Sequence, residues 1–455
     1  MAVPVSLMMD MFDTARRTLV VGLGRTGLSV ARFLSRRGVP VAIVDSRETP
    51  PGLEALRAEL PADVALFLGG FKAEAFERAE QVIVSPGVSV KEPLIAAAAA
   101  RGVAVIGDVE LFAQLITAPV VAITGSNGKS TVTTLLNAMA QSAGREVRMG
   151  ANIGTPALDL IAEREPDLFV LELSSFQLET TFSLRPAAAV VLNLSADHMD
   201  RYDDLDAYSK VKQSIYRNAA IQIVNADDPL VARLAYPDKP QIRYTMGVPK
   251  EGEYGLCDYQ GASWLARGDE PIMPVSGIRM DGRHNVSNTL AALALGEAAG
   301  LPRDAMIEAI NEFRGLPHRM QLVAHQAGIR WYNDSKGTNV GATLAAIDSA
   351  QGRVVLIAGG DAKGADLAPL APAMREKGRA AVLIGRDAPR LQEVLQSVIP
   401  LERAADLQEA VELAARMAQP GDSVLLSPAC ASTDMYRDYQ ERGELFVKAV
   451  REFVT

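Results

Sequence analysis

A short glycine-containing loop between a strand and a helix constrains this chain more than any other feature. Residues 124–131 read TGSNGKST, after the apolar segment PVVAI and before the helical pattern TVTTLLNAMAQSAG. Backbone N–H groups and a helix N-terminus can hold phosphate in such a loop, Lys129 adds a positive charge, and Ser130 or Thr131 can reach a Mg²⁺ ion. The loop departs from G-x-x-x-x-G-K-[ST] because Ile123 replaces the first glycine. The alternative is a corner of small residues, but Gly-Lys-Ser-Thr after a strand favours phosphate binding.

Length, composition and charge indicate a soluble, multidomain globular protein. The 455 residues are enough for roughly three domains, and 48% hydrophobic with 22% charged residues is ordinary for a soluble globular protein. A net charge of −9 argues against broad attraction to nucleic acid or an acidic membrane. Two cysteines, Cys257 and Cys430, indicate a reducing cytoplasm. We expect neither a signal peptide in MAVPVSLMMDMFDTARR nor a membrane span, since no apolar run approaches about 18–20 residues.

The first segment predicts a parallel sheet with a nucleotide-binding turn. TLVVGLGRTGLSVARFLSRRG and then VAIVD indicate strand, glycine turn, helix and strand. The turn from Gly22 to Gly27 fits G-x-G-x-x-G, and Asp45 ends the next strand about 20 residues on, as a ribose-binding acid does. Taken alone this pattern predicts a dinucleotide site, although such folds host many functions.

Two further segments follow, and the whole chain is predicted to be α/β with three domains. The first, residues 1–107, is Rossmann-like. The central domain, residues 108–315, carries the phosphate loop on a mostly parallel sheet of the P-loop ATPase kind, with hairpins or loops between about 245 and 280. The third, residues 316–455, is again Rossmann-like, with buried strands at VVLIAGG, AAVLIG and SVLLSPA.

Two polar residues follow or end apolar strands of the central segment. Glu172 sits at the end of the apolar strand in LFVLELSS, where a carboxylate is costly unless it is paired, binds a metal or faces water; oxygen donors suit Mg²⁺. His198, in SADHMDRY, follows VVLNL, and ligands bind at the carboxyl edge of parallel strands. Helix capping by Ser195 or Asp197 is an alternative that can hold at the same time.

Lys212 has an unusual position on its predicted helix. At about 100° per residue, the helix from Ala207 has an apolar stripe that includes Tyr208 and Ile215. Lys212 falls about 40° from Tyr208, inside that stripe, whereas Lys210 falls about 200° away and faces solvent. Snorkelling of the lysine stem is one explanation, and a special role near a metal is the other.

The third segment places small, hydroxyl and charged residues after strands. His318 and Arg319 lie in GLPHRMQ, and three loops follow apolar strands: NDSKGTN (333–339), GGDAKGAD (359–366) and SPACASTDMY (427–436). One such loop would be ordinary, but three at comparable edges favour a site for a small polar ligand.

Taken in order, these motifs resemble those of the Mur ligases. The matching sequences are TGSNGKST, LELSSFQLETT, DHMDRY, NADD, HN-x-x-N, GLPHR, NDSKGTN, GGDAKGAD, SPACAS and RG-x-x-F, over nearly the whole chain. The resemblance implies a monomeric, cytoplasmic acid–D-amino-acid ligase that uses ATP and Mg²⁺, with two metal sites, and binds neither nucleic acid nor membrane. Its implied substrates are UDP-N-acetylmuramoyl-L-alanine and D-glutamate, in peptidoglycan synthesis and therefore in cell-wall biogenesis, cell shape and cell division.

The resemblance also implies roles for individual residues. The implied catalytic residues are Lys129, Glu172, His198 and a carbamylated Lys212, and the implied metal ligands are Ser130, Glu172, His198 and Lys212. The implied ATP contacts are Gly125, Ser126, Asn127, Gly128, Lys129, Ser130, Thr131, Asn288, Arg319 and Asp334. The implied contacts to the UDP substrate are Arg25, Thr26, Asp45, Ser46, Arg47, Ser85, Asn152 and Ser174. Those to D-glutamate are Lys336, Thr338, Lys363, Ser432 and Tyr439, the last replacing an expected phenylalanine.

The implied mechanism is stepwise, through an acyl phosphate that the amine of D-glutamate attacks. Three substrates and three segments also suggest domain closure. Three other functions remain open at this point: a nicotinamide oxidoreductase, a non-catalytic nucleotide-dependent switch, and a sister ligase that adds another amino acid or acts on folate. The first leaves TGSNGKST and the third segment unexplained.

Overall fold

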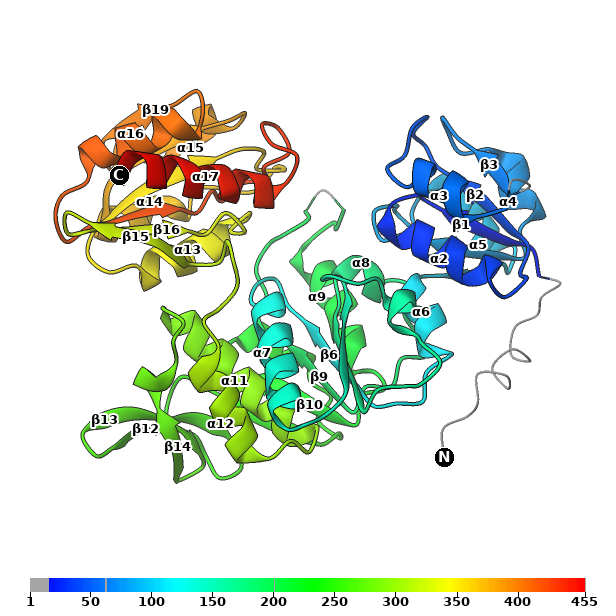
Figure 1. Ribbon diagram of the computed structural model, residues 1–455, viewed down its shortest axis with the longest axis horizontal. Coiled ribbons are helices and arrows are strands. Elements are labelled where there is room, and N and C mark those ends of the chain that lie inside the picture. Colours follow the sequence, from blue (N-terminus) through cyan, green and yellow to red (C-terminus); the bar gives the residue numbers. More distant parts are fainter. Residues whose placement is uncertain (1–15, 62–63, 200, 455) are drawn as a thin grey trace.

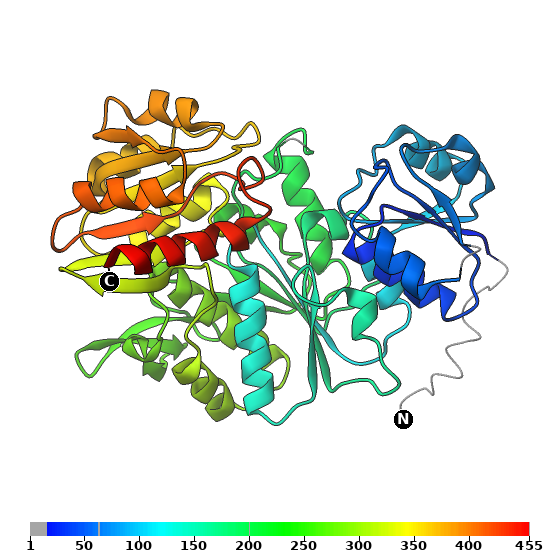
Figure 2. The ribbon, with the colours of Figure 1, turned by 45° about the horizontal axis from the view of Figure 1, so that its top comes forward.

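The computed structural model describes residues 16–61, 64–199 and 201–454 and contains three α/β bodies, each built on its own sheet (Figures 1 and 2). The three sheets take their strands from residues 18–106, 120–274 and 321–426, which confirms three α/β domains. The boundaries at 107/108 and 315/316 fall between sheets and remain predictions. Two predictions concern residues outside the described part of the chain. They are the expected absence of a signal peptide, which falls mostly on residues 1–15, and the DHMDRY motif at Asp200.

The first domain is a five-stranded parallel sheet in the order β3-β2-β1-β4-β5. Its strands are β1 (Thr18–Val21), β2 (Val41–Val44), β3 (Ala65–Phe67), β4 (Gln81–Val84) and β5 (Ala104–Ile106). Its helices are α2 (Arg25–Ser35), α3 (Leu53–Glu59), α4 (Ala73–Arg78) and α5 (Pro93–Ala100). The strand order reverses between β1 and β4, so their carboxyl ends form a crevice suited to a ligand. A Cβ at Gly27 would lie 1.8 Å from the Gly22 carbonyl oxygen, so only glycine lets α2 start this close to β1.

The central domain has a nine-stranded sheet in the order β14-β13-β12-β11-β10-β9-β6-β8-β7. Its strands are β6 (Val120–Thr124), β7 (Val147–Ala151), β8 (Leu168–Glu172), β9 (Ala188–Val191), β10 (Ile221–Asn225), β11 (Gln241–Tyr244), β12 (Tyr254–Tyr259), β13 (Ala262–Arg267) and β14 (Glu270–Pro274). Pairing is parallel from β7 to β12 and antiparallel among β12, β13 and β14, which confirms hairpins in the 245–280 region. Strand β6 lies between β8 and β9, so the loops after these three strands are neighbours.

The helices of the central domain pack on both faces of this sheet or connect its strands. They are α6 (Asp108–Ala113), α7 (Lys129–Ser142), α8 (Ser175–Leu178), α9 (Leu205–Gln213), α10 (Pro229–Leu234), α11 (Arg283–Ala298) and α12 (Arg303–Glu312). Short 3₁₀ turns lie at η2 (Ala157–Leu160), η3 (Ser214–Tyr216) and η4 (Val275–Gly277). Helices α11 and α12 both pack against α7, beside the hairpin end of the sheet (Figure 1).

The third domain has a six-stranded sheet in the order β15-β16-β20-β17-β18-β19, parallel except for β15. Its strands are β15 (Gln321–Gln326), β16 (Ile329–Asn333), β17 (Val354–Gly359), β18 (Gly378–Ile384), β19 (Leu401–Arg403) and β20 (Ser423–Leu426). Its helices are α13 (Val340–Ser349), α14 (Leu370–Lys377), α15 (Ala388–Leu395), α16 (Leu407–Met417) and α17 (Tyr439–Val454). The sequence had not indicated α13 or α17, which start directly after polar loops. Strands β16, β20 and β17 are adjacent, so the three polar loops leave the same edge of the sheet.

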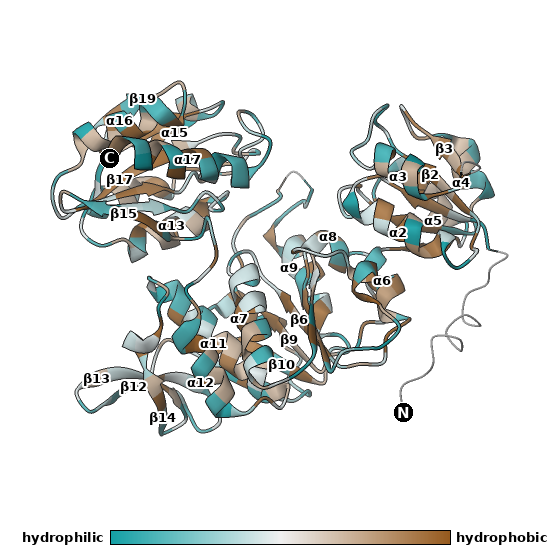
Figure 3. Cartoon of the chain, viewed as in Figure 1, coloured by the Kyte–Doolittle hydropathy of each residue, from teal (hydrophilic) through white to brown (hydrophobic). Residues whose placement is uncertain are grey.

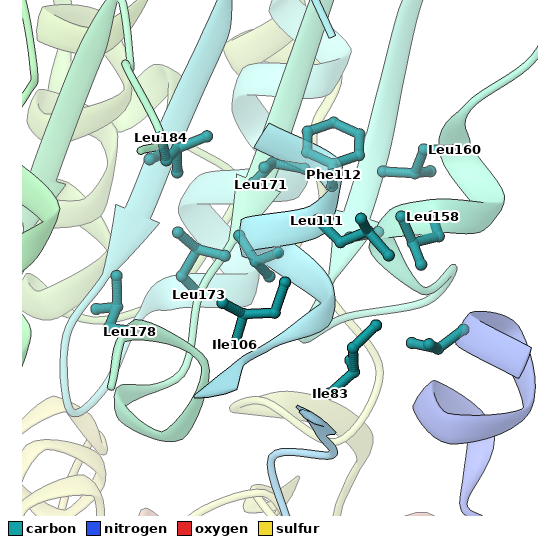
Figure 4. Close-up of a cluster of buried hydrophobic side chains, with 14 of the residues drawn as sticks. Ile83, Ile106, Leu111, Phe112, Leu158, Leu160, Leu171, Leu173, Leu178 and Leu184 are labelled. Atoms are coloured by element: carbon teal, nitrogen blue, oxygen red, sulfur yellow. The ribbon is translucent and has the colours of Figure 1, made fainter. Parts of the chain in front are cut away.

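Apolar residues lie mainly on the strands and on the inner faces of the helices (Figure 3). One apolar cluster continues from the first domain into the central domain (Figure 4). It includes Ile83 and Ile106 of the first sheet together with Phe112 of α6, Leu171 of β8 and Leu178. The first domain is therefore attached to the central one by a shared core as well as by the chain.

None of the described helices is long and apolar enough to cross a membrane.

Candidate active site

The glycine loop connects β6 to α7 as the sequence predicts. Gly128 precedes α7 with a left-handed φ of 82°, and Lys129 is the first helical residue. The Ser126 hydroxyl donates to the Ser195 carbonyl and accepts from the Ser195 N–H, both at 3.0 Å. The Asn127 N–H donates to Asn193 Oδ1 at 2.8 Å. The loop is therefore fixed to the segment that follows β9, which also carries His198.

Lys129 bends back over its own loop. Its Nζ donates to the Gly125 carbonyl at 2.8 Å and to the Ser126 carbonyl at 3.0 Å. Burial lowers the pKa of Lys129, while the nearby carboxylates of Glu172 and Asp197 oppose that shift. A phosphate in the loop would therefore meet a positive charge in a partly buried site, where electrostatic attraction is stronger than in bulk water.

Glu172 is buried, so the alternative that its carboxylate faces water is wrong. It ends β8, is 3% exposed, and its Oε1 accepts from Asn152 Nδ2 at 2.6 Å. Its other oxygen, Oε2, is buried and has no hydrogen-bond partner among the described residues. An unpartnered buried carboxylate oxygen is costly, and binding a hard cation would offset that cost.

His198 lies in the loop after β9 in a left-handed conformation, with φ of 58°. Its ring packs edge-on against Phe176, with centroids 4.6 Å apart, and its Nε2 lies 3.8 Å from Asp197 Oδ2. Neither Ser195 nor Asp197 caps the next helix, because Asp204 is the residue that caps α9.

Lys212 is buried at its charged end, which excludes snorkelling. The residue is 1% exposed, and its Nζ donates to the Gly125 carbonyl at 3.0 Å and to Thr124 Oγ1 at 3.3 Å. Burial, followed by the positive charge of Lys129, holds the pKa of Lys212 well below its usual value. Lys210 instead pairs with Asp206 at 2.7 Å on the exposed face.

The helical stripe predicted around Lys212 is only partly regular. Helix α9 starts at Leu205 and ends at Gln213, and Ile215 lies in the 3₁₀ turn that follows. Tyr208 is more than a packing residue, since its hydroxyl lies 3.3 Å from Ser126 Oγ in the glycine loop. Lys212 Nζ lies 4.7 Å from the centroid of the Tyr208 ring.

The third-domain loops approach the same place from the other side. Lys336 Nζ lies 3.8 Å from the centroid of the Tyr439 ring, and burial together with the positive charge of Arg319 lowers the pKa of Lys336 to about 8. Arg319 Nη2 donates to Ser130 Oγ at 2.7 Å, which links the third domain to the first turn of α7.

A central cavity of about 390 Å³ lies between the second and third domains. It is bordered by fifteen of the residues predicted from the sequence: Ser126, Asn127, Gly128, Lys129, Asn152, Glu172, Ser174, His198, Lys212, Arg319, Lys336, Thr338, Lys363, Ser432 and Tyr439. Gly125 and Ser130 are not among its walls. Their contacts to Lys129, Lys212 and Arg319 place them directly behind it.

A second cavity, of about 340 Å³, extends from the glycine loop toward α11. Its walls include Thr131, Asn288 and Asp334, and it shares Arg319 and Lys336 with the central cavity. Burial raises the pKa of Asp334 to about 7, although Ser427 Oγ donates to its Oδ2 at 2.7 Å. This cavity lies next to the glycine loop, where the sequence predicts that ATP binds. We call it the nucleotide cavity.

A third cavity, of about 530 Å³, lies at the switch point of the first sheet. We call it the first-domain cavity. Its walls contain the predicted residues Arg25, Thr26, Asp45, Ser46, Arg47, Ser85 and Asn152. Burial alone would raise the pKa of Asp45, but the Arg47 side chain and the Leu23 and Arg47 N–H groups hold it at about 2. Asn152 borders both this cavity and the central one, so the two adjoin.

Among the side chains of the central site that sequence reasoning did not assign to it are Asn339 and Asp197. Asn339 and Asn127 face each other across the domain boundary, with Asn339 Nδ2 3.2 Å from Asn127 Oδ1. Asp197 borders the central cavity and lies 3.4 Å from Asn339 Nδ2. Asn339 ends the NDSKGTN motif, so the sequence placed it in a candidate loop. Its contact with Asn127 could not be predicted, because the two residues are 212 positions apart.

The candidate metal ligands are few. The described residues contain no group of three or more His, Cys, Asp or Glu side chains that could hold a metal ion. Glu172, with its unpartnered oxygen, and His198 border the central cavity, while the Ser130 hydroxyl accepts from Arg319. The donor set therefore fits a hard cation with further oxygen ligands, such as phosphate, water or a carbamate.

Three family models match the chain along its length. The description "Mur ligase MurD-like, N-terminal domain" matches residues 16–107, "Mur ligase middle domain" matches 123–296, and "Mur ligase, glutamate ligase domain" matches 318–430. The chain belongs to the Mur ligase family. Among similar curated proteins, the UDP-N-acetylmuramoylalanine–D-glutamate ligase of Nitrosococcus oceani is 56% identical over 97% of this chain and 98% of its own. The ligase of that name from Pseudomonas aeruginosa is 49% identical over 95% and 97%.

Solved structures of this family share the fold at low identity. The UDP-N-acetylmuramate-alanine ligase of Thermotoga maritima has a TM-score of 0.60 at 19% identity, covering 96% of this chain and 100% of its own. The pseudomurein peptide ligase type C of Methanothermus fervidus has a TM-score of 0.59 at 18% identity, with the same coverage. Because the chain is a Mur ligase, the glycine turn of its first domain does not indicate a nicotinamide oxidoreductase.

Proposed function

We propose that this Mur ligase joins D-glutamate to UDP-N-acetylmuramoyl-L-alanine at the expense of ATP, in the cytoplasmic synthesis of peptidoglycan precursors. Support comes from curated relatives of that name, which are 56% and 49% identical over nearly the whole chain. The chain is proposed to act as a monomer, without nucleic acid or membrane partners, with domains 1–107, 108–315 and 316–455.

One observation carries the proposal: a single cavity is bordered by the phosphate loop, by Glu172 and Lys212, and by the third-domain loops. It adjoins the nucleotide cavity through Arg319 and the first-domain cavity through Asn152. A three-substrate ligation needs this arrangement, because the reacting carboxylate, phosphate and amine must meet while their remaining parts are held apart.

The three cavities support the proposed residue roles. The nucleotide cavity suits ATP, whose phosphates would extend along residues 125–131 toward the central cavity. The first-domain cavity suits the uridine diphosphate part of the second substrate, with Asp45 and Arg47 at its wall. Amino-acid binding is assigned to Lys336, Thr338, Lys363, Ser432 and Tyr439, among which the lysines suit the carboxylates of D-glutamate.

In the proposed reaction, the terminal carboxylate of the UDP substrate attacks the γ-phosphate of ATP, giving an acyl phosphate and ADP. The amine of D-glutamate, in its neutral form, then attacks the acyl carbon; phosphate leaves with the electron pair of its C–O bond, and the nitrogen gives up one proton to phosphate or water. Lys129 offsets the negative charge of the transferred phosphoryl group, and Lys336 and Lys363 orient the incoming amino acid. A free carboxylate reacts poorly with an amine because oxide is a poor leaving group, and the phosphorylation step removes that barrier.

Mg²⁺, at two proposed sites, would neutralise phosphate charge when bound. Glu172, His198 and Ser130 are its proposed protein ligands, together with Lys212 as a carbamate. The structure supports carbamylation at Lys212 in one respect: a buried amine with a lowered pKa is more often neutral, and only a neutral amine adds CO₂. Carbamylation converts that amine into an anionic oxygen donor beside Glu172, which would be costly without a cation.

The proposal is tested by measuring phosphate release while substrates are omitted one at a time. We expect ADP and phosphate in equal amounts, with one amide formed per phosphate, only when ATP, UDP-N-acetylmuramoyl-L-alanine and D-glutamate are all present. Lys129→Ala is expected to abolish this release. ATP hydrolysis that is independent of the other two substrates would contradict the proposal and favour a nucleotide-dependent switch.

A further inference from the structure

Arg201 connects the first domain to the loop that carries His198. Its Nη1 donates to the Pro86 carbonyl at 3.1 Å and its Nη2 to the Val88 carbonyl at 3.2 Å, both in the first domain. On the central domain, its guanidinium pairs with Glu179 through two N–H groups and lies 4.3 Å from the centroid of the Phe176 ring. One largely buried side chain thus contacts both domains at once.

The groups that Arg201 contacts border both adjoining cavities. Pro86 and Val88 line the first-domain cavity, and Phe176 lines the central cavity. Upstream, the Ser85 hydroxyl donates to the Gly22 carbonyl at 2.8 Å, in the nucleotide-binding turn. The backbone N–H of Arg201 itself donates to the His198 carbonyl at 2.9 Å. A continuous series of contacts therefore runs from the glycine turn of the first domain to His198.

The chemistry of the contacts requires arginine. A planar guanidinium has five N–H donors in a fixed arrangement, so it can serve two carbonyls and a carboxylate while its face covers an aromatic ring. A lysine has one nitrogen and cannot serve carbonyls on one side and a carboxylate on the other in the same geometry. The side chains of Arg201 and Glu179 are 12% and 10% exposed, so water screens this pair weakly.

A second ion pair between the same two domains provides a control. Lys91 Nζ lies 3.2 Å from Asp203 Oδ1, two residues after Arg201, but these side chains are 65% and 84% exposed. Exposed pairs of this kind contribute little to stability. If an ion pair between the two domains were sufficient for activity, loss of either pair would have the same effect on the kinetic constants. If burial and multiple contacts are required, only substitutions in the Arg201 pair would change them.

We propose that Arg201 is a positioning residue that couples occupancy of the first-domain cavity to the conformation of the His198 loop. The inference rests on the proposed function, because it takes the UDP-linked substrate as the ligand that spans the two cavities. When that ligand fixes residues 85–88, Arg201 holds the His198 turn and Phe176 in place beside the reacting end of the same substrate.

The test compares the native chain with Arg201→Lys, Glu179→Gln and the control Lys91→Ala. We expect Arg201→Lys to raise KM for UDP-N-acetylmuramoyl-L-alanine about tenfold and to lower kcat by a similar factor, while KM for ATP changes less than about twofold. Glu179→Gln, which keeps the shape of the partner, is expected to act in the same direction with a smaller effect. Lys91→Ala is expected to match the native chain in all three constants.

Hydrogen exchange separates coupling from a loss of folding. In the native chain, the UDP substrate should slow exchange in peptides that contain Ser85 and Val88 and also in those that contain Arg201 and Tyr202. In Arg201→Lys only the first set should respond, and in Glu179→Gln the second set should respond less than in the native chain. Equal protection of both sets in these variants, or an equal kinetic loss in Lys91→Ala, would overturn the inference and leave the proposed ligation intact. Absence of substrate binding and turnover in the native chain would overturn both.

Discussion

Replacing Gly128 by alanine should raise KM for ATP, because the added Cβ would displace the side chain of Asn288. Gly128 has a left-handed φ of 82°, and an added Cβ would lie 2.5 Å from Asn288 Oδ1 and 3.4 Å from Leu192 Cδ1. Asn288 borders the nucleotide cavity and would have to move. Gly144, at the other end of the same helix, has a φ of 71° with nothing within 4 Å of its added Cβ. Gly144→Ala therefore imposes similar backbone strain without disturbing the cavity.

The expected magnitudes follow from these contacts. A left-handed non-glycine residue costs about 1–2 kcal/mol, so both variants should lose stability of that order. Gly128→Ala also disturbs the hydrogen bond of 3.2 Å from Asn288 Nδ2 to Asn285 Oδ1, worth about 1 kcal/mol more. If Asn288 contacts the nucleotide, loss of one hydrogen bond of about 0.5–1.5 kcal/mol raises KM for ATP roughly 2- to 10-fold.

The assay is steady-state phosphate release at varied ATP for the native chain and both variants, with thermal unfolding curves recorded alongside. We expect both variants to unfold at lower temperature, with Gly128→Ala the lower, and only Gly128→Ala to change KM for ATP. The same KM for ATP in Gly128→Ala as in Gly144→Ala would refute the placement of ATP beside Asn288.

Three further predictions concern the lysine, a buried carboxylate and the domain arrangement. Lys212→Ala should lose most activity and regain part of it with short carboxylates or bicarbonate, since these can supply an anionic oxygen in its place; full turnover without them would exclude a carbamate. The pKa of Asp45 is lowered from 3.8 to about 2, so its ionised form stabilises the fold above pH 4 and that contribution is lost toward pH 2. Asp45→Asn should therefore flatten the acid-induced fall in thermal stability measured by circular dichroism; an unchanged slope would count against the role of Arg47. Small-angle scattering should show a smaller radius of gyration with ATP and UDP substrate than without them, and an unchanged radius would argue against domain closure.

Much of the fold was predictable because its signals are local. Alternating apolar strands and amphipathic helices indicate parallel sheets, and TGSNGKST marks one strand–helix junction without reference to any other segment. Burial of Lys212 was predictable for the same reason, since the helical period alone places it beside Tyr208. Its helix nevertheless ends at Gln213, because the last turn tightens into a 3₁₀ turn that the period does not show.

The contacts between domains could not be predicted in this way. Arg201 meets the Pro86 carbonyl across 115 residues, and Asn339 meets Asn127 across 212. Both partners are ordinary polar groups in their own segments, and nothing in their local sequence indicates which other loop they face. The orphaned oxygen of Glu172 is a further case, since only the packed structure shows that water is excluded from it.

The central claim is that the third-domain loops select D-glutamate as the amino acid that is ligated. The most direct test supplies ATP and UDP-N-acetylmuramoyl-L-alanine with D-glutamate, L-glutamate, L-alanine, L-lysine or diaminopimelate in separate reactions, and measures amide product by mass together with phosphate release. We predict product and stoichiometric phosphate with D-glutamate alone, and loss of both in Lys336→Ala and Lys363→Ala. Faster incorporation of any other amino acid, or product from a folate acceptor instead of the UDP substrate, would contradict the claim.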